Sequence, residues 1–202
     1  MLDTYYEKGL KSIQRRDFQQ AIEDFSRSIF ADASSSAYAN RAFCYYRLEN
    51  FEEAVHDYEK AIDMTVGLIN KADENDKRYV TQCFSDLARN IATIGQIQTE
   101  RSNFIEAEKQ YDELLSIHEV IKGKVDLPTE SHIGHAYFNR GMAKLQQSKS
   151  DAAVRDFAAG YYESADVQEI RQGISMAVEM FGLNSVFNST LQVYSMLKGG
   201  RR

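Results

Sequence analysis

Cysteine and histidine are the residue types in this chain with the clearest potential for nucleophilic or metal chemistry. Cys44 and Cys83 are the only two cysteines, and each lies in a stretch with a helical pattern. Two thiols in such places do not make a disulfide framework, and neither carries the local signature of a catalytic nucleophile. We interpret both as buried, inert thiols and expect a protein of a reducing, cytoplasmic compartment.

Two of the four histidines could in principle face one metal ion. His132 and His135 are three residues apart at the start of an expected helix, with Glu130 beside them. A zinc site, however, needs three or four ligands in a fixed geometry, with hydrogen-bonded residues behind them to orient the ligands. We interpret these three residues as solvent-exposed polar side chains, and we expect no metal and no cofactor.

Other catalytic patterns are absent from the sequence. The glycines stand singly at packing or cap positions, so no glycine-rich loop is present to hold a phosphate. No Ser/His/Asp or Cys/His arrangement has a recognisable local spacing. An enzyme or a metalloprotein is therefore the least favoured of three function classes, and we do not expect catalysis.

Composition favours a helical, protein-binding domain. The 202 residues are 43% hydrophobic, which is enough to bury the core of one domain over residues 1–202, and a single proline leaves long stretches without helix breakers. The net charge is -6 with scattered Lys and Arg, whereas nucleic acid or an anionic membrane needs a basic patch. No stretch approaches the roughly 20 apolar residues that span a bilayer. We expect a protein or peptide partner, no nucleic acid and no membrane insertion.

One segment of the chain is repeated in edited form. The sequence "YANRAFCYYRLENFEEAVHDY" (residues 38–58) returns as "YFNRGMAKLQQSKSDAAVRDF" (residues 137–157). Tyr, Asn and Arg near the start, and Ala, Val and Asp near the end, keep their offsets, while almost everything between them changes. This pattern predicts that the retained residues hold one helix pair together and that the changed ones face solvent or a ligand.

A wider pattern recurs four times along the chain. A small residue is followed twelve positions later by Ala, with an aromatic residue four positions beyond that Ala. The sets are Gly9, Ala21, Phe25; Ala42, Ala54, Tyr58; Gly95, Ala107, Tyr111; and Gly141, Ala153, Phe157. Small residues on two helices allow a close approach, and the aromatic side chains fill the space around it. The pattern therefore predicts four helix pairs.

The predicted turns between the paired helices carry signals for helix starts. Asp17 with Gln20, Asn50 with Glu53 and Asn103 with Glu106 each have the spacing of a capping box, in which the first side chain caps the helix and the second bonds back. In the fourth turn Ser150 is the capping candidate, and only this one lacks the distal partner. We expect the second helix of each pair to start at these positions.

This arrangement resembles the tetratricopeptide repeat, whose pattern has an aromatic residue, Leu-Gly, a second aromatic residue, and Ala and Phe on the second helix. The resemblance implies an all-α, right-handed superhelical array of about four helix pairs with C-terminal capping helices. The units would be 2–34, 35–70, 75–123 and 130–165, with caps at 166–198. The closing proline of the family pattern is missing, and Lys8, Arg41, Ile94 and Arg140 stand where Leu is usual.

The spacing between units predicts lengthened helices. The apolar helical period runs past the expected end of the second unit, enters the third early and overruns it. Turns are expected near residues 73–77 and 125–131, where Pro128 marks the turn and Thr129 or Ser131 can cap the next helix. The last helix, 183–197, is amphipathic, and we expect it to cap the end of the array, with a lid over the binding groove as the alternative.

In proteins of this family the first helices line a concave face that binds extended peptides or partner helices. Carried over by position, that face implies a set of apolar, aromatic and polar residues: Tyr6, Leu10, Ala39, Asn40, Phe43, Tyr46, Arg47, Ala92, Gln96, Phe138, Asn139 and Met142. The alternative is that the apolar stripes among them are core beneath a neighbouring helix.

Some members of the family hold a chaperone's C-terminal carboxylate with Lys, Asn and Arg side chains. Asn40 and Asn139 match one Asn of that clamp, but Tyr6 and Leu10 stand where Lys and Asn are expected. We therefore expect an apolar or mixed peptide. The implied function is a non-catalytic scaffold or adaptor, and the alternative is a self-associating protein that uses the same stripes as a homodimer interface.

Overall fold

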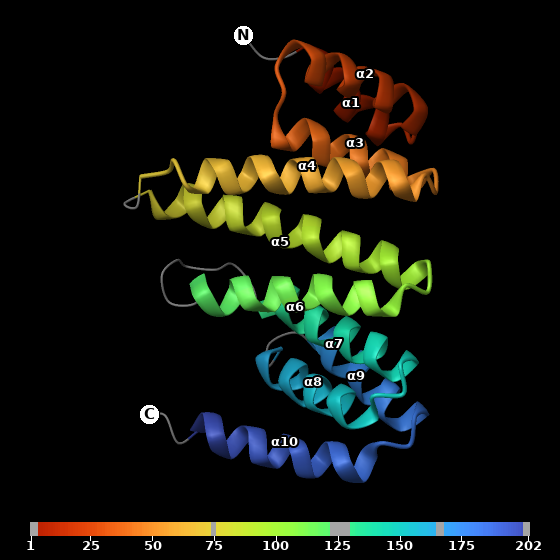
Figure 1. Cartoon of the computed structure of the whole chain (residues 1–202), viewed down its shortest axis with the longest axis vertical. Helices are drawn as coiled ribbons and strands as arrows, with labels where there is room; N and C mark the ends of the chain where they lie inside the picture. The colour runs from red at the N-terminus through yellow and green to blue at the C-terminus, as the bar shows by residue number, and fades with distance from the viewer. Residues whose placement is uncertain (1–3, 74–75, 122–129, 165–167, 200–202) are drawn as a thin grey trace. The chain divides into compact units, whose positions relative to one another are not determined.

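In a computed structural model of the chain, the described residues are 4–73, 76–121, 130–164 and 168–199, and the regular structure within these ranges is entirely helical (Figure 1). The helices are α1 (Thr4–Gln14), α2 (Phe18–Ala31), α3 (Ser35–Arg47), α4 (Phe51–Ile69), α5 (Lys77–Glu100), α6 (Phe104–Ile121), α7 (Glu130–Gln146), α8 (Ser150–Glu163), α9 (Gln168–Met180) and α10 (Asn184–Gly199). The chain divides into two compact units, Met1–Ile97 and Gln98–Arg202, each with hydrophobic clusters of its own.

Consecutive helices pack in pairs, as the sequence predicted. In the first unit α1 packs on α2 and α3 on α4, and in the second unit α7 packs on α8. Neighbouring pairs also touch, because α2 packs on α3 and α6 on α7. The predicted fold class, an all-α array of tetratricopeptide-like helix pairs with capping helices, is confirmed.

The small residues lie where the paired helices are closest. A Cβ atom on Gly9 would lie 2.7 Å from the Phe25 ring, and one on Gly141 would lie 2.6 Å from the Phe157 ring. Both rings are fully buried. Because a larger residue would have to displace a buried ring, these positions require glycine.

An ion pair ties the two helices of each duplicated segment together. The Arg41 guanidinium donates through Nε and Nη2 to the two carboxylate oxygens of Asp57, at 2.6 and 2.8 Å. Arg140 binds Asp156 in the same bidentate way, at 2.9 and 2.6 Å. Both carboxylates are buried, and a bidentate guanidinium satisfies most of their hydrogen-bonding capacity. This pair explains why Arg and Asp survive in both copies of the segment.

The tyrosines that both copies of the segment retain, Tyr38 and Tyr137, belong to the same contact. The guanidinium of Arg41 lies over the Tyr38 ring at 5.5 Å, and that of Arg140 lies over the Tyr137 ring at 5.4 Å. A ring face attracts a cation and also shields it from water. The retained Tyr, Arg and Asp therefore hold a helix pair together, as predicted. The retained Asn does not, because Asn40 donates to the Tyr6 hydroxyl of α1, in the preceding pair.

Each helix pair is joined by a turn of one shape. The four turns have a residue with a φ close to +60° two positions before the second helix starts: Arg16, Glu49, Ser102 and Ser148. None of these four is a glycine. The left-handed conformation lets the chain reverse within three residues, and its recurrence with four side chains shows that the turn geometry is set by the packing of the helices.

The predicted caps of these turns are only partly correct. The Gln20 N–H donates to Asp17 Oδ1 at 3.2 Å, as expected for a capping residue. Asn50 makes no side-chain cap, so the capping box predicted there is wrong, and the position has only its backbone to start α4. Asn103 Nδ2 instead donates to Gln98 Oε1 at 2.9 Å, on the preceding helix, and the cap predicted for Asn103 stays a prediction.

The helices from α4 to α6 are long, as expected. They contain 19 residues in α4, 24 in α5 and 18 in α6. Asp76 starts α5, since its Oδ1 accepts from the Tyr79 N–H at 3.1 Å. Pro128 and Thr129 lie outside the described residues, as does the side chain of Ser131, so the turn predicted there stays a prediction.

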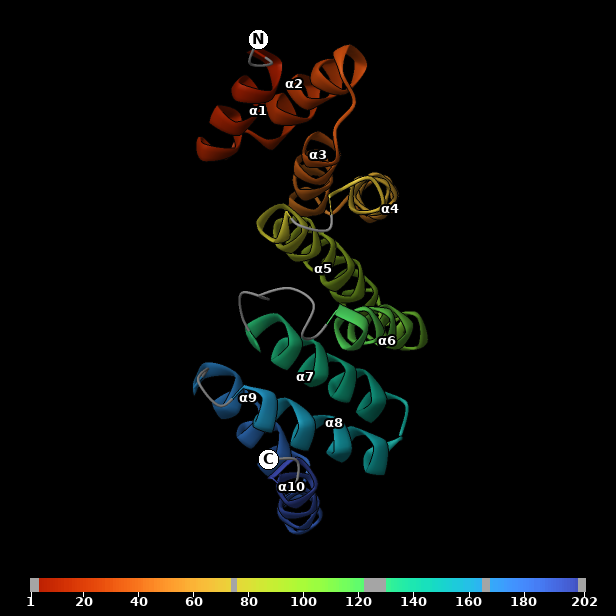
Figure 2. The ribbon, with the colours of Figure 1, turned by 90° about the vertical axis from the view of Figure 1, so that its left-hand side faces the viewer.

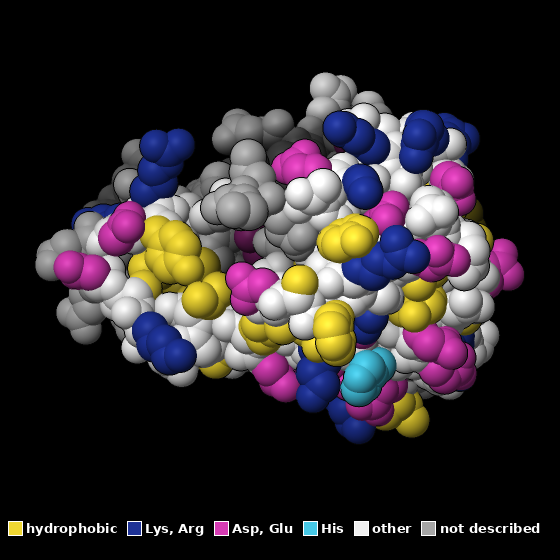
Figure 3. All heavy atoms as spheres, turned by 90° about the horizontal axis from the view of Figure 1, so that it is seen from above, with side chains coloured by type: hydrophobic (Ala, Val, Ile, Leu, Met, Phe, Trp, Pro, Cys, Tyr) yellow, Lys and Arg dark blue, Asp and Glu magenta, His cyan; other side chains and the backbone are white. Residues whose placement is uncertain are grey.

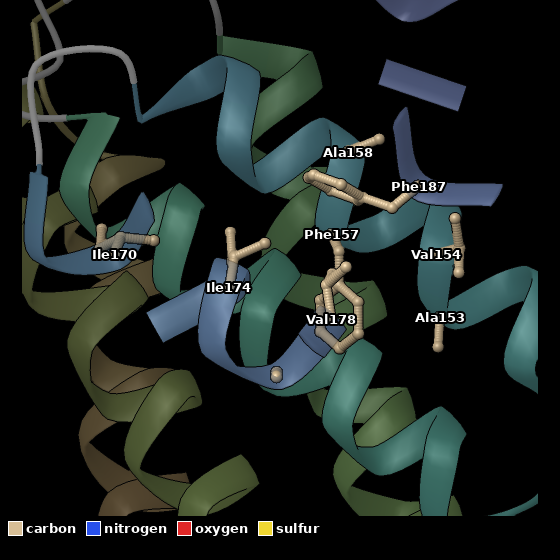
Figure 4. Packing of buried hydrophobic residues seen from close by; sticks show 9 residues of the cluster. Ala153, Val154, Phe157, Ala158, Ile170, Ile174, Val178 and Phe187 are labelled. Atoms are coloured by element: carbon tan, nitrogen blue, oxygen red, sulfur yellow. The ribbon is translucent and has the colours of Figure 1, made fainter. Parts of the chain in front are cut away.

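The last two helices cover α8. In the second unit α9 packs on α7 and α8. Helix α10 packs on α8, and Figure 2 shows that it crosses α8, because α10 is seen nearly end-on while α8 runs across the view. Figure 4 shows the core that results, in which Ile174 and Val178 of α9 and Phe187 of α10 belong to one cluster with residues of α8. Gly182 between them has a φ of +66°, which fits the predicted C-terminal cap of α9. These helices are the predicted caps.

Candidate partner-binding surfaces

Charged side chains of both signs are interspersed on the part of the surface shown in Figure 3, with hydrophobic side chains between them. No helix among the described residues is long and apolar enough to cross a bilayer. Within the described residues there is also no group of three or more His, Cys, Asp or Glu side chains that could hold a metal ion. The side chains of Glu130 and His132 lie outside those residues.

The two thiols are buried. Cys44 is fully buried, and burial raises the pKa of its thiol to about 12. The pKa of Cys83 is also raised, chiefly by burial. A thiol with a raised pKa stays protonated at neutral pH and is a poor nucleophile, as we interpreted both residues from the sequence.

The residues expected on a concave face are mostly half-buried, so they serve the core and the surface together. In the first unit Tyr6, Leu10 and Phe43 pack against one buried cluster, and Ala39 and Tyr46 against another. Their packing gives the core interpretation partial support. Each of these side chains still keeps part of its surface open. A partner that covered them would extend the existing core.

A pocket of about 240 Å³ opens beside this row in the first unit. Its wall combines three of the predicted residues with polar side chains from α3, α4 and α5. The lining residues are Tyr6, Ser35, Ser36, Ala39, Asn40, Thr65, Asp86, Arg89 and Asn90. Four helices therefore contribute to one small polar cavity.

Amide groups dominate the chemistry of this pocket. Asn40 Nδ2 donates to the Tyr6 hydroxyl at 3.0 Å, which leaves the Asn40 carbonyl oxygen free to accept. Asn90 is 4% exposed and lines the same pocket with its side-chain amide. Such a group can both donate to and accept from a ligand, as a peptide backbone requires.

Arg89 is a pocket residue that the sequence analysis missed. It lies beside Asp86, with Nη2 and Oδ1 3.2 Å apart, and the Arg89 and Asp86 side chains are 61% and 40% exposed. Because the two charges offset one another, this wall of the pocket offers little net positive charge. Arg89 is three residues before Ala92 of the predicted face on α5, a helical spacing that could have indicated it.

The other predicted residues of the first unit make contacts among themselves. The Arg47 guanidinium lies 5.0 Å from the centre of the Phe18 ring and 5.8 Å from that of Phe43. Gln96 Nε2 donates to the Tyr46 hydroxyl at 2.9 Å. Arg47 and Gln96 are exposed, so both lie at the edge of an aromatic surface.

In the second unit the predicted residues lie on α7. Phe138 and Met142 pack against the cluster of Figure 4, and the Phe138 and Phe157 rings lie 6.1 Å apart. Asn139 hydrogen-bonds the Tyr111 hydroxyl, which is otherwise buried; burial raises the pKa of Tyr111 to about 12, and the hydrogen bonds act in the opposite direction. All three predicted residues are half-buried, which resembles the first unit.

Consecutive helix pairs with small residues at their crossings and one recurring turn define a helical repeat protein. Residues 35–64, which include α3 and most of α4, match the family model described as "Tetratricopeptide repeat". DnaJ homolog subfamily C member 7 of Mus musculus is 42% identical over 57 residues, which are 28% of this chain and only 12% of that relative. Residues 35–64 of the chain therefore form a tetratricopeptide repeat.

Several solved structures have a similar fold over most of the length of this chain. The crystal structure of MamA has a TM-score of 0.61 at 14% identity, with 96% of this chain and 97% of that chain covered. The apo form of RapI has a TM-score of 0.66 at 11% identity, with 95% and 52% covered. BtubC from P. vanneervenii has a TM-score of 0.63 at 16% identity, with 95% and 77% covered. At such identities the likeness concerns the fold.

Proposed function

We propose that the chain is a non-catalytic scaffold or adaptor that binds a peptide or helix of a partner protein on the concave face of its first helices. Tetratricopeptide repeat proteins are generally protein-interaction scaffolds without catalytic activity. The surface properties of the first unit support the same role, because half-buried aromatic residues lie next to amide groups that can bind a peptide backbone.

The pocket around Asn40 and Asn90 is the observation that carries this proposal. The side-chain amides of Asn40 and Asn90 line this pocket, and an amide can both donate to and accept from a peptide backbone. The half-buried rings of Tyr6 and Phe43 supply apolar area nearby. A mixed peptide, with apolar side chains and an accessible backbone, fits both features.

The experiment is a comparative capture from native lysate followed by mass spectrometry. The baits are the native chain, Asn40→Ala and Arg89→Glu, with Arg155→Glu as the matched control, since Arg155 is exposed on α8. We expect one set of proteins to bind the native chain and the control but not the two pocket variants. Equal capture by all four baits would contradict the proposed site.

The alternative is a self-associating structural protein in which the same stripes form a homodimer interface. Light scattering on the pocket variants separates the two functions. If the stripes join two copies, Asn40→Ala should lower the molar mass; if they bind a partner, the molar mass should be unchanged while capture is lost.

A further inference from the structure

Helix α10 has two apolar sides, and only one of them is covered within its unit. On the inner side Phe187 is 6% exposed and meets the Tyr161 ring of α8 at 5.8 Å. On the other side four apolar residues are between 48% and 69% exposed: Val186, Val193, Met196 and Leu197. A surface helix normally has one apolar side, so the second stripe calls for a partner. We call these four residues the outer stripe.

The outer stripe has the spacing of a helix-packing seam. Val193 follows Val186 by two helical turns, and Leu197 follows by one turn more, so the three lie along one line of the helix. The hydroxyl groups beside them are already paired. Ser189 Oγ donates to the Ser185 carbonyl at 3.0 Å, and Thr190 Oγ1 donates to the Val186 carbonyl at 2.8 Å. An apolar surface could cover this side of α10 without leaving those two donors unpaired.

The distribution of charge along the sequence indicates what covers the outer stripe. The chain is 27% charged, yet no charged residue stands between Glu179 and Lys198. An acidic or basic partner would find no charge there to pair with. Two copies of this chain, each with a net charge of -6, repel one another over most surfaces, but along the outer stripe no like charges meet. Depletion of charge and enrichment in Met are also typical of the core of an interface.

We propose that the outer stripe of α10 is a homodimer interface, in which it packs against the outer stripe of a second copy across a two-fold axis. In such an interface each residue meets the same patch on the other chain, so an uncharged apolar stripe is complementary to itself. The surface differs from the pocket of the first unit, so the two can be tested apart. Dimerisation would present two partner-binding arrays in one particle.

The test is the molar mass of the full chain by light scattering or sedimentation equilibrium between about 1 and 100 μM, which resolves a dissociation constant near 10 μM. We expect the native mass to rise towards two chains. Val193→Glu places two carboxylates in the interface, so it should remain at one chain throughout, as should Leu197→Glu. Ile105→Glu is the matched control, because Ile105 is an equally exposed apolar residue on α6, and it should dimerise like the native chain.

Circular dichroism melts at the lowest concentration accompany each variant. Unchanged melting temperatures with a halved molar mass for Val193→Glu and Leu197→Glu support the proposal. A native chain that stays monomeric, or variants that stay dimeric, would overturn it. Unfolding of the dilute glutamate variants would mean that the stripe faces the core, and that result would overturn it as well.

Discussion

Single glycines set the distance between paired helices. At Gly141 the nearest atom to an added Cβ belongs to the buried ring of Phe157, whereas a Cβ on Gly67 would meet nothing within 4 Å. Both residues lie inside helices, α7 and α4. The same residue type is therefore indispensable at one position and incidental at the other, and only the contact across the pair distinguishes them.

Gly141→Leu should lower the free energy of unfolding by about 1–3 kcal/mol or more, because the new side chain overpacks a close helix contact. Gly67→Leu is the control, and it should be neutral or slightly stabilising, since leucine favours the helix by up to about 1 kcal/mol over glycine. Urea melts of the two variants measure both changes. Equal stabilities for Gly141→Leu and the native chain would show that the fourth helix pair is misplaced.

The two buried ion pairs differ in what remains when the arginine is removed. Asp156 also accepts from Lys144 Nζ at 2.9 Å, whereas Arg41 is the only cation recorded on Asp57 among the described residues. Arg41→Met should therefore leave a buried charge without a cation and cost about 3–5 kcal/mol. Arg140→Met should cost less. Thermal melts that rank the two variants in the opposite order would contradict the role given to Lys144.

The pocket around Asn40 should not depend on a peptide's terminal charge. Arg89 lies there beside Asp86, and Tyr6 takes the place of a lysine, so a carboxylate would gain little. A peptide with acidic residues and a free carboxylate should bind as tightly as its amidated form. Calorimetry would measure both affinities, and a loss of tenfold or more on amidation would overturn this interpretation of the pocket.

At the scale of elements, the helix pairs were predictable and the turns between them were not. The twelve-residue spacing located the crossing of Gly141 with the α8 helix, because a close approach restricts residue size at that point. The left-handed residue of each turn left no mark on the sequence, since Arg16, Glu49 and two serines adopt the same conformation. At Asn50 the residue type predicted a cap that the structure does not contain, because its side chain makes no hydrogen bond to the start of α4.

The candidate site was predictable only as a row of positions. Asn40 was identified by its place in the repeat, but the pocket beside it needs Arg89 and Asn90 from α5, and the spacing between the second and third units is irregular. The register of α5 against α3 depends on how the long helices pack, which no local pattern specifies. The same row also proved to be partly core, since a half-buried stripe serves both purposes.

The turn conformation itself can be tested at Glu49. A non-glycine residue in the left-handed region costs roughly 1 kcal/mol or more, so Glu49→Gly should stabilise the chain by up to about 1 kcal/mol. Glu59→Gly, in the middle of α4, should destabilise it by about the same amount. Chemical denaturation would compare the two. A destabilised Glu49→Gly variant would mean that the Glu49 side chain supports the turn.

At the scale of the whole molecule, an array of helix pairs must close its exposed end. In the second unit α10 does this through contacts with α8: Phe187 lies on Tyr161, and the Tyr162 and Tyr194 rings are 5.3 Å apart. Tyr194 Oη also donates to Glu163 Oε1 at 3.3 Å. These contacts join the cap to the second helix of the pair, so α10 completes the core of its unit.

The contacts of α10 with α8 therefore allow us to predict the effect of truncating the chain after Gly182. Removing α10 exposes the apolar face of α8 that Phe187 covers, so the shortened chain should melt at a lower temperature or aggregate, without tighter binding of partners captured by the native chain. Phe187→Ala in the full chain isolates the same contact and should cost about 3–5 kcal/mol. Gln192→Ala, an exposed position on the same helix, should be neutral within about 0.5 kcal/mol. Calorimetric melts of the truncated chain and the two point variants measure these changes.

A truncated chain that stayed folded and bound its partner more tightly would instead make α10 a lid over the binding groove, since a helix tethered to the array competes with the partner at an effective concentration of order millimolar.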